Sequence, residues 1–472
     1  MPAIWKELPV TGDSYRNVDE SELDQISPLA QDGYIDELGY TQKRPGLSSL
    51  IELGTSAGID GLYWWEQQGI ALVVSAGRTW KITDLTGTKT EITGDLLASG
   101  TPVTFAPNGT TMVMANGGRM VTSAAGGATT YIADGDAPTT VSHVAFLDGY
   151  TLANQTGTQR FWWSDNLAPL SWNASSQAQA QGSPDNLTAL HVGWREILLA
   201  GTDSLEVWYD DGVTPFVRLN GGFVQRGIGA IYSIQQVGTN WMWLDESRRF
   251  VKLDNRTPTI VSFPFNKQLH EMSVVSDAVS TMMEIDGLPL YVVSFPNAGR
   301  TFAYHYIKDA WQDWGNWNTT TGVYDSFRGR QYCFARPWNL HLVGDKSNGL
   351  VYSASRSYFT DNGNPIRTIR RTGFVSHGTM LHKFSKQLRI RLKRGAGNAS
   401  VADPQMFVRW RNDGGAWGNE HWLSMGQTGQ YEYLAQLKNL GRYQFRQYEF
   451  GHADNSDFIL VGAQELIEEG TH

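Results

Sequence analysis

Short apolar runs separated by polar turns recur along most of the chain. Residues 187–191, 197–200 and 205–209 are three such runs, and the turns at 193–196 and 201–204 contain glycine and polar residues that tolerate turn dihedrals. The run at 197–200 is continuously apolar and too short for a helix, and the run at 205–209 is β-branched and aromatic. The pattern predicts short antiparallel strands joined by tight turns.

The same unit recurs from about residue 57. Units begin near Leu62, Val103, Val144, Leu187, Ile228, Met283 and Tyr324. The starts recur about every 41 residues, with one longer step after Ile228, and four-stranded repeats of about 40–45 residues are the signature of propeller blades. A small twisted sheet cannot cover both of its own faces, so such sheets stack around an axis. We predict an all-β fold with a six- or seven-bladed β-propeller over residues 57–360, in which an N-terminal strand could complete the last blade.

The two flanking segments differ from this repeat. Residues 1–56 are interrupted by proline and glycine and predict an extended segment that lies against the rest of the protein or a neighbour. After a turn cluster at 361–365, alternating runs at 388–392, 406–411, 441–449 and 458–466 predict a C-terminal β-sandwich or barrel over residues 361–472. Within the longer step, apolar residues at helical spacing over 266–280 predict one helix, which either covers the propeller or is offered to a partner.

Composition agrees with many strands and turns. The 472 residues include 50 Gly, 18 Trp, 19 Tyr and 19 Phe, and a single cysteine, Cys333, which excludes an intrachain disulfide. The first residues have no apolar core typical of a signal peptide, and no apolar run is long enough to span a bilayer. The net charge of −9 argues against a chain that grips nucleic acid as a whole.

Charge is unevenly distributed along the chain. Acidic residues crowd the first segment, at Asp19, Glu20, Glu22, Asp24, Asp32, Asp36 and Glu37. Basic residues crowd 366–411, and the candidates for a basic surface between subunits are Arg367, Arg370, Arg371, Lys383, Lys386, Arg389 and Arg391. One interpretation is a solvated face. The other is a pair of complementary surfaces that join neighbouring chains.

The sequence contains no constellation typical of an enzyme. It has no G-x-S-x-G, H-E-x-x-H, Walker or CxxC motif. Carboxylates on turns could form a glycosidase pair, namely Asp148, Asp210, Asp211, Asp245 and Glu246, but the spacing of sialidase Asp-boxes is absent. Acidic turns at 134–136 and 454–457 could bind calcium, although such turns usually cap themselves. We predict no catalytic, cofactor or metal site.

Tryptophans provide the second class of candidates. Sugar stacking or packing between blades would explain Trp163, Trp172, Trp208, Trp311, Trp314 and Trp317. The alternative function is therefore a carbohydrate-binding propeller that presents exposed tryptophans.

One ordered set of residues resembles a known family. The set is Trp163, Asp165, Trp172, Pro184, Asp185, Gly201, Glu206, Trp208 and Gly227. Together with Arg44-Pro45-Gly46 before the first blade, this order resembles the tail hub, or nozzle, proteins of short-tailed bacteriophages, also called packaged-DNA stabilisation proteins. The resemblance extends over most of the chain, including the C-terminal domain.

The resemblance implies a structural virion protein. Members of that family form a hexameric ring below the portal and its adaptor, and the ring is a conduit for DNA during ejection. It helps to retain packaged DNA and offers surfaces to tailspikes or fibres and to a needle or plug. We therefore expect assembly in the host cytoplasm, location in the virion tail, and DNA as transiting cargo.

Overall fold

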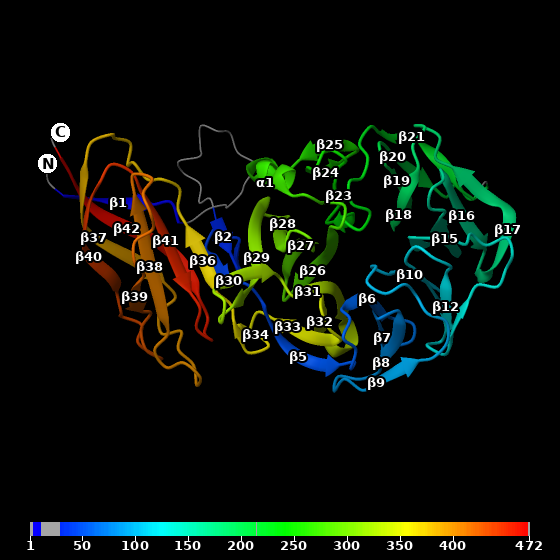
Figure 1. The fold of residues 1–472 in the computed structure, drawn as a ribbon, viewed down its shortest axis with the longest axis horizontal. Coiled ribbons are helices and arrows are strands. Elements are labelled where there is room, and N and C mark those ends of the chain that lie inside the picture. Colours follow the sequence, from blue (N-terminus) through cyan, green and yellow to red (C-terminus); the bar gives the residue numbers. More distant parts are fainter. Residues whose placement is uncertain (1–2, 11–28, 214, 471–472) are drawn as a thin grey trace.

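The computed structural model describes residues 3–10, 29–213 and 215–470, and these residues form two all-β bodies (Figure 1). One is a ring of small sheets. The other is a pair of facing sheets that contains both ends of the described chain. No helix in the described ranges is long and apolar enough to cross a membrane.

Seven units of four antiparallel strands build the ring. The first blade contains β6 (Ile59–Trp65), β7 (Ile70–Ser75), β8 (Arg78–Ile82) and β9 (Lys89–Ile92). The second contains β10 (Thr104–Asn108), β11 (Thr111–Ala115), β12 (Val121–Ala124) and β13 (Thr129–Tyr131). The third contains β14 (Val144–Leu147), β15 (Tyr150–Asn154), β16 (Arg160–Asp165) and β17 (Ala168–Gln179). The fourth contains β18 (Leu187–Gly193), β19 (Glu196–Gly201), β20 (Leu205–Tyr209) and β21 (Val217–Val224). The fifth contains β22 (Gln235–Val237), β23 (Asn240–Leu244), β24 (Phe250–Asp254) and β25 (Thr257–Ile260). The sixth contains β26 (Val279–Ile285), β27 (Leu288–Phe295), β28 (Arg300–His305) and β29 (Ala310–Asn318). The seventh contains β31 (Gly329–Ala335), β32 (Leu340–Asp345), β33 (Leu350–Ser355) and β5 (Gly46–Glu52).

The hydrophobic pattern explains this arrangement. Second strands such as β7 and β27 are buried along their whole length, whereas the outermost strand β9 is mostly exposed. A separate apolar cluster fills each of the seven spaces between neighbouring sheets, including the space between the last sheet and the first. In that last space Ile59 of β6 packs with Val351 of β33. The ring is therefore a closed, seven-bladed propeller, which confirms the predicted architecture and decides the number of blades.

An N-terminal strand closes the ring. β5 pairs antiparallel with β33, from Glu52 opposite Leu350 to Gly46 opposite Ser355. β5 comes from the start of the chain and β31, β32 and β33 from the end of the repeat. The last blade therefore joins residues about 300 positions apart, and its pairing holds the ring together.

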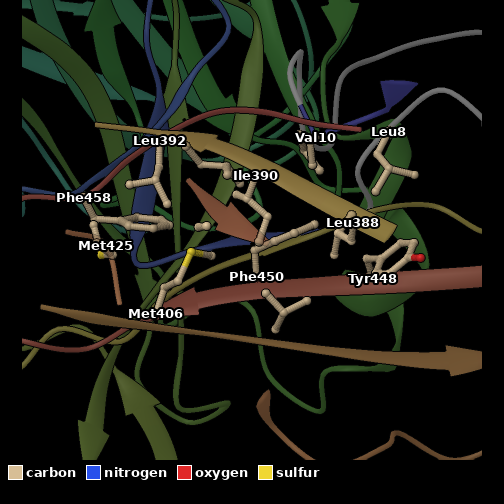
Figure 2. Packing of buried hydrophobic residues seen from close by; sticks show 14 of the residues in the cluster. Leu8, Val10, Leu388, Ile390, Leu392, Met406, Met425, Tyr448, Phe450 and Phe458 are labelled. Atoms are coloured by element: carbon tan, nitrogen blue, oxygen red, sulfur yellow. The ribbon is translucent and has the colours of Figure 1, made fainter. Parts of the chain in front are cut away.

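The second body is a β-sandwich. One sheet contains β1 (Ile4–Leu8), β3 (Gly33–Ile35), β4 (Thr41–Lys43), β42 (Ile459–Glu469), β37 (Lys383–Leu392) and β40 (Ala435–Tyr443). The other contains β2 (Leu29–Gln31), β36 (Thr368–Arg371), β41 (Arg446–His452), β38 (Gln405–Asn412) and β39 (His421–Ser424). Figure 2 shows the core between them, in which Leu8 and Val10 of the N-terminal segment lie beside Ile390 and Phe450.

One sheet continues from the propeller into the sandwich. β2 pairs in parallel with β29 of the sixth blade at Gln31 and Asp313, and antiparallel with β36 of the sandwich. The short strand β30 (Val323–Ser326) also pairs with β29, while β34 (Thr360–Asp361) and β35 (Asn364–Pro365) extend the last blade beyond β5. The first segment is thus built into both bodies.

The predicted helix over 266–280 is wrong in its length. The structure has a 3-10 turn, η2 (Phe263–Phe265), and one helix in the described residues, α1 (Asn266–Glu271); a second 3-10 turn, η3 (Arg336–Trp338), lies in the last blade. Met272 is extended, with ψ of 132°. Val274 and Val275, β-branched residues that lose side-chain freedom in a helix, follow it. Leu269 and Val275 are still buried in one cluster. The spacing of apolar residues therefore predicted correctly which residues are buried, but not how far the helix extends.

Candidate functional site

A buried arginine lies where the propeller meets the sandwich. Arg44 follows β4 of the sandwich and precedes β5 of the propeller, and its side chain is fully buried. Its guanidinium donates to the carboxylate of Asp32 at 2.8 Å and to that of Asp361 at 2.5 and 3.0 Å. It also donates to the carbonyl oxygen of Gly315 at 2.8 Å and to that of Pro45 at 3.2 Å.

These acceptors belong to separate parts of the fold. Asp32 follows β2, Asp361 is in β34 after the last blade, and Gly315 is in β29 of the sixth blade. Burial acts to lower the pKa of Arg44, but the carboxylates of Asp361 and Asp32 outweigh it and raise the pKa above its usual range. The guanidinium of Arg44 is therefore charged, and its hydrogen bonds connect the N-terminal segment, the strand β34 that follows the last blade, and β29 of the sixth blade.

The predicted family-motif residues lie together in the third and fourth blades. Trp163 and Asp165 are in β16, Trp172 is in β17, Pro184 and Asp185 precede β18, Gly201 ends β19, Glu206 and Trp208 are in β20, and Gly227 follows β21. Asp185 accepts hydrogen bonds from the backbone N–H of Asp203 at 2.9 Å and from Ser204 at 2.9–3.0 Å. The buried Glu206 accepts from the backbone N–H of Gly182 at 2.5 Å and from the indole of Trp208 at 2.8 Å. These carboxylates hold turns and do not face a common cleft.

Two glycines of the motif are required by close approach. A Cβ at Gly201 would lie 2.1 Å from the Asp185 carboxylate, and one at Gly227 would lie 1.9 Å from the carbonyl oxygen of Thr202. Both distances are shorter than any real contact of a Cβ. The motif therefore specifies how the fourth blade is joined to its neighbours.

The candidate basic residues do not form one continuous surface. Arg370 and Lys383 are fully buried, so the prediction that they contribute to a surface is wrong. Lys383 donates to the carbonyl oxygens of Thr379 and Gln444, at 2.6 and 2.7 Å, and Arg370 donates to that of Val10 at 3.1 Å. Lys383 in β37 and Arg370 in β36 point into the interior of the sandwich, where their charged groups are held by hydrogen bonds to backbone carbonyl oxygens.

The other five basic residues have partners within the chain. Arg371 pairs with the buried Glu449 at 2.5 Å and Arg367 pairs with Glu420 at 2.8 Å. The remaining contacts are Lys386 with Glu468 at 2.8 Å, Arg391 with Glu7 at 3.2 Å, and Arg389 over the ring of Trp5 at 4.3 Å. Lys386 and Arg391 remain about half exposed, with side-chain exposures of 45% and 54%. Of the acidic candidates, Asp19, Glu20, Glu22 and Asp24 lie outside the described residues.

Two of the candidate carboxylates, the neighbours Asp245 and Glu246, share the guanidinium of Arg226 at 3.7 and 3.5 Å, whereas Asp148 lies in another blade. Asp148 pairs with Arg195 at 2.7 Å and Asp245 with Arg249 at 3.1 Å. The acidic turn at 134–136 caps itself, since Asp134 accepts the backbone N–H of Asp136 at 2.9 Å. Over the described ranges no three His, Cys, Asp or Glu side chains are placed to hold a metal ion.

The tryptophans serve mainly in packing. Trp172, Trp311 and Trp314 are buried. Trp163 and Trp208 are partly buried in the cluster between the third and fourth blades. Trp317 lies under the guanidinium of Arg367 at 4.8 Å. Three of the six tryptophans are thus buried and three are partly buried, which favours packing over sugar stacking.

Aromatic side chains occupy the propeller interior near its axis. His143, just before β14, stacks on Tyr232 at 5.2 Å and meets the ring of His191 in β18 edge-on at 5.1 Å. Burial lowers the pKa of His143 to about 4, so the ring is neutral at physiological pH. These residues come from the inner edges of three consecutive blades, and their rings pack against one another there.

Comparison with known families decides the relationship. A family described as "Bacteriophage P22 Gp10, beta-propeller" matches residues 26–357, and one described as "Bacteriophage P22 Gp10, beta-sandwich" matches residues 369–467. The chain belongs to the bacteriophage P22 Gp10 family. The two matches cover the propeller and the sandwich in the order in which the structure has them. No curated protein matches the chain.

Solved structures with a related outline are distant from this family member. The computationally designed Ika8 protein is 11% identical, with a TM-score of 0.38, over 65% of this chain and 99% of its own. The Pan2 WD40 domain of Neurospora crassa is 10% identical, with a TM-score of 0.42, over 64% of this chain and 90% of its own. YCF48 bound to D1 peptide is 11% identical, with a TM-score of 0.42, over 66% of this chain and 98% of its own. These values carry no conclusion about function.

Membership gives the general role. The P22 Gp10 family consists of structural phage tail proteins, so the chain is a component of a phage tail, and this argues against an enzyme. The predicted resemblance is confirmed.

Sequence reasoning missed the role of Arg44 as the buried junction. It noted Arg44-Pro45-Gly46 only as an entry into the first blade. The signal available was an arginine between two strand-like runs, in a segment rich in aspartate.

Proposed function

We propose that copies of this chain form the nozzle ring of a short phage tail, below the portal adaptor. The proposal is supported by family membership and by the uneven distribution of charge along the chain. Residues 361–472 contain 14 Lys and Arg against 11 Asp and Glu, whereas residues 57–360 contain 20 against 26 and residues 1–56 contain 4 against 10. The C-terminal strands of the sandwich, within residues 361–472, are net basic and the propeller is net acidic, and these parts lie at opposite ends of one molecule, which suits a head-to-tail contact (Figure 1).

Lys386 and Arg391 are the basic residues best placed to take part in such a contact. Each is half exposed and is paired with a carboxylate of similar exposure. Exposed pairs contribute about 0–1 kcal/mol, so exchanging an internal carboxylate for one on a neighbouring chain costs little. The ring is hexameric in this proposal, and its outer surface carries tailspikes or fibres while its lower end holds a needle or plug.

The DNA conduit lies between chains in this proposal. The rings of His143, His191 and Tyr232 pack together at the inner edges of three blades, which supports a path for the duplex outside the single propeller. A bore lined by a protein of net charge −9 would repel phosphate and let the strand slide during ejection. A reconstructed ring whose bore is lined mainly by Lys and Arg would contradict the sliding argument.

The assembly test uses electron microscopy and mass photometry of the full chain, alone and with the portal-adaptor ring. We expect closed rings. The double variant Lys386→Glu/Arg391→Glu should weaken ring formation at least tenfold in midpoint concentration. The matched control is Arg78→Glu, because Arg78 is a 55% exposed arginine paired across strands with Glu91 on the first blade.

Two outcomes would contradict the proposal. A chain that stays monomeric with and without the adaptor removes the ring itself. If the double variant and the control assemble equally well, Lys386 and Arg391 are not part of the contact between chains, although the ring itself is still formed. Deletion of residues 1–40, which would also impair assembly, is not a clean test, because it removes β1, β2 and β3 from sheets within the chain.

A further inference from the structure

A groove with an aromatic wall lies between the sixth and seventh blades. Its volume is about 560 Å³. Blade six supplies Met282, Glu284 and Tyr306, and blade seven supplies Phe334 and His341. None of these residues belongs to the basic surface or to the family-motif cluster.

Three stacked rings form the wall on the seventh blade. The imidazole of His341 lies between the rings of Phe334, at 4.6 Å and 21°, and Tyr332, at 6.1 Å and 16°. Phe334 is the outermost ring and is 36% exposed. The stack therefore presents an open aromatic face to the groove.

Hydrogen bonds fix the orientation of this stack. The backbone N–H of Asp286 donates to Nε2 of His341 at 3.2 Å, which favours the tautomer with its proton on Nδ1, and the Asp286 carboxylate lies 3.5 Å from Nε2. Nδ1 then donates to the Tyr332 hydroxyl at 2.9 Å, and that hydroxyl donates to the carbonyl oxygen of Glu284 at 2.8 Å. Burial lowers the pKa of His341, which keeps the imidazole neutral as this chain of bonds requires. These hydrogen bonds hold the rings of His341 and Tyr332 in place without a ligand.

Polar side chains around the groove have unused hydrogen-bonding capacity. The carboxylate of Glu284, the guanidinium of Arg336 and the amide of Asn339 line it. In the part of the chain that the structure describes, none of these three side chains has a hydrogen-bond or ion-pair partner. Asp286 also lines the groove, but its carboxylate already accepts hydrogen bonds from the Ser355 hydroxyl at 2.9 Å and from the backbone N–H of Arg356 at 2.8 Å. The lining therefore has two carboxylates and one guanidinium, which disfavours a phosphate.

We propose that this groove binds a short neutral oligosaccharide. The C–H face of a pyranose stacks on an aromatic ring, and its hydroxyls both donate and accept, so they match a carboxylate, a guanidinium and an amide together. The volume is within the range of small-ligand pockets, about 300–1,000 Å³. The site differs from the tryptophan-based alternative, because its platform is Phe334 and not one of the buried tryptophans.

The test is ligand binding by the isolated full-length chain, which does not depend on ring formation. Maltotriose, cellotriose, chitotriose and a delipidated O-chain fragment of lipopolysaccharide are the probes, measured by saturation-transfer NMR and calorimetry. We expect at least one to bind with a Kd of about 1 mM or tighter. Phe334→Ala should weaken that binding about tenfold, which corresponds to about 1.4 kcal/mol, and Glu284→Gln should weaken it as well.

The matched control is Phe146→Ala. Phe146 is 38% exposed and lies near the end of β14, the first strand of the third blade, as Phe334 lies near the end of β31. Phe146→Ala should leave binding unchanged, and melting curves of both variants should match the parent chain.

Three results would overturn the proposal. The first is no saturation transfer to any of the four probes. The second is equal binding by Phe334→Ala and Phe146→Ala. The third is tighter binding of spermidine than of every saccharide with loss on Glu284→Gln, which would make the groove a cation site. The nozzle proposal would survive each of them.

Discussion

Replacing Arg44 with methionine tests how the two bodies are joined. Methionine has similar length and no charge, so the substitution keeps most of the packing against Phe327, whose ring lies 4.7 Å from the guanidinium. It removes all donors to Asp32, Asp361 and Gly315. Both carboxylates then remain buried without their cation.

The expected loss is large. Removing one partner of a buried ion pair costs about 3–5 kcal/mol, because the remaining charge is left uncompensated. Two carboxylates are left here, so we expect the upper end of that range. Since Arg44 joins segments of both bodies, the propeller and the sandwich should also unfold at separate denaturant concentrations in the variant.

Guanidinium chloride denaturation followed by tryptophan fluorescence and calorimetry measures the free energy of unfolding. Arg78→Met is the control, because its pair with Glu91 is exposed and should contribute less than about 1 kcal/mol. The triple variant Arg44→Met/Asp32→Asn/Asp361→Asn should recover part of the loss, since it removes the buried charges. A loss below about 1 kcal/mol in Arg44→Met, or no recovery in the triple variant, would refute the reasoning.

Three further substitutions test single features. Burial raises the pKa of Asp313 to about 6, so its contribution to stability is present below about pH 4 and is lost as the pH rises through 6. Asp313→Asn should flatten that fall by about 3 kcal/mol at pH 8, measured as the free energy of unfolding by chemical denaturation across the pH range. Gly227→Ala should cost about 1–3 kcal/mol in chemical denaturation because of the carbonyl oxygen of Thr202, whereas Gly118→Ala, with nothing within 4 Å, should be neutral. Burial lowers the pKa of Lys43 to about 7, so its contribution to stability is present above about pH 10 and is lost as the pH falls through 7. Lys43→Met should therefore raise the free energy of unfolding at pH 6 by about 1–3 kcal/mol. A lower free energy of unfolding in the variant at pH 6 would contradict this.

The repeat could be predicted from sequence because each blade is a local structure. Strands within a blade are consecutive, so apolar runs and turn residues specify them within about 40 residues. The predicted start near Val144 coincides with the start of β14, and that near Leu187 with the start of β18. The exact number of blades was left open, because it depends on the pairing of β5 with β33 across the length of the chain.

The basic surface could not be predicted because ion pairing is not local. Between residues 366 and 411 the sequence shows only one opposing carboxylate, at Asp403. In the fold Arg371 meets Glu449 and Arg391 meets Glu7, residues 78 and 384 positions away. Burial of Lys383 was likewise hidden, because an alternating strand shows which residues share a face but not which face is covered.

The segment 29–52 links ring closure to the position of the sandwich. Its β2 pairs with both the sixth blade and the sandwich, and its β5 completes the seventh blade. Only Arg44 and Pro45 separate the sandwich strand β4 from β5, so β5 cannot leave the ring without pulling on the buried ion pairs of Arg44. Opening the propeller therefore requires disruption of the junction as well.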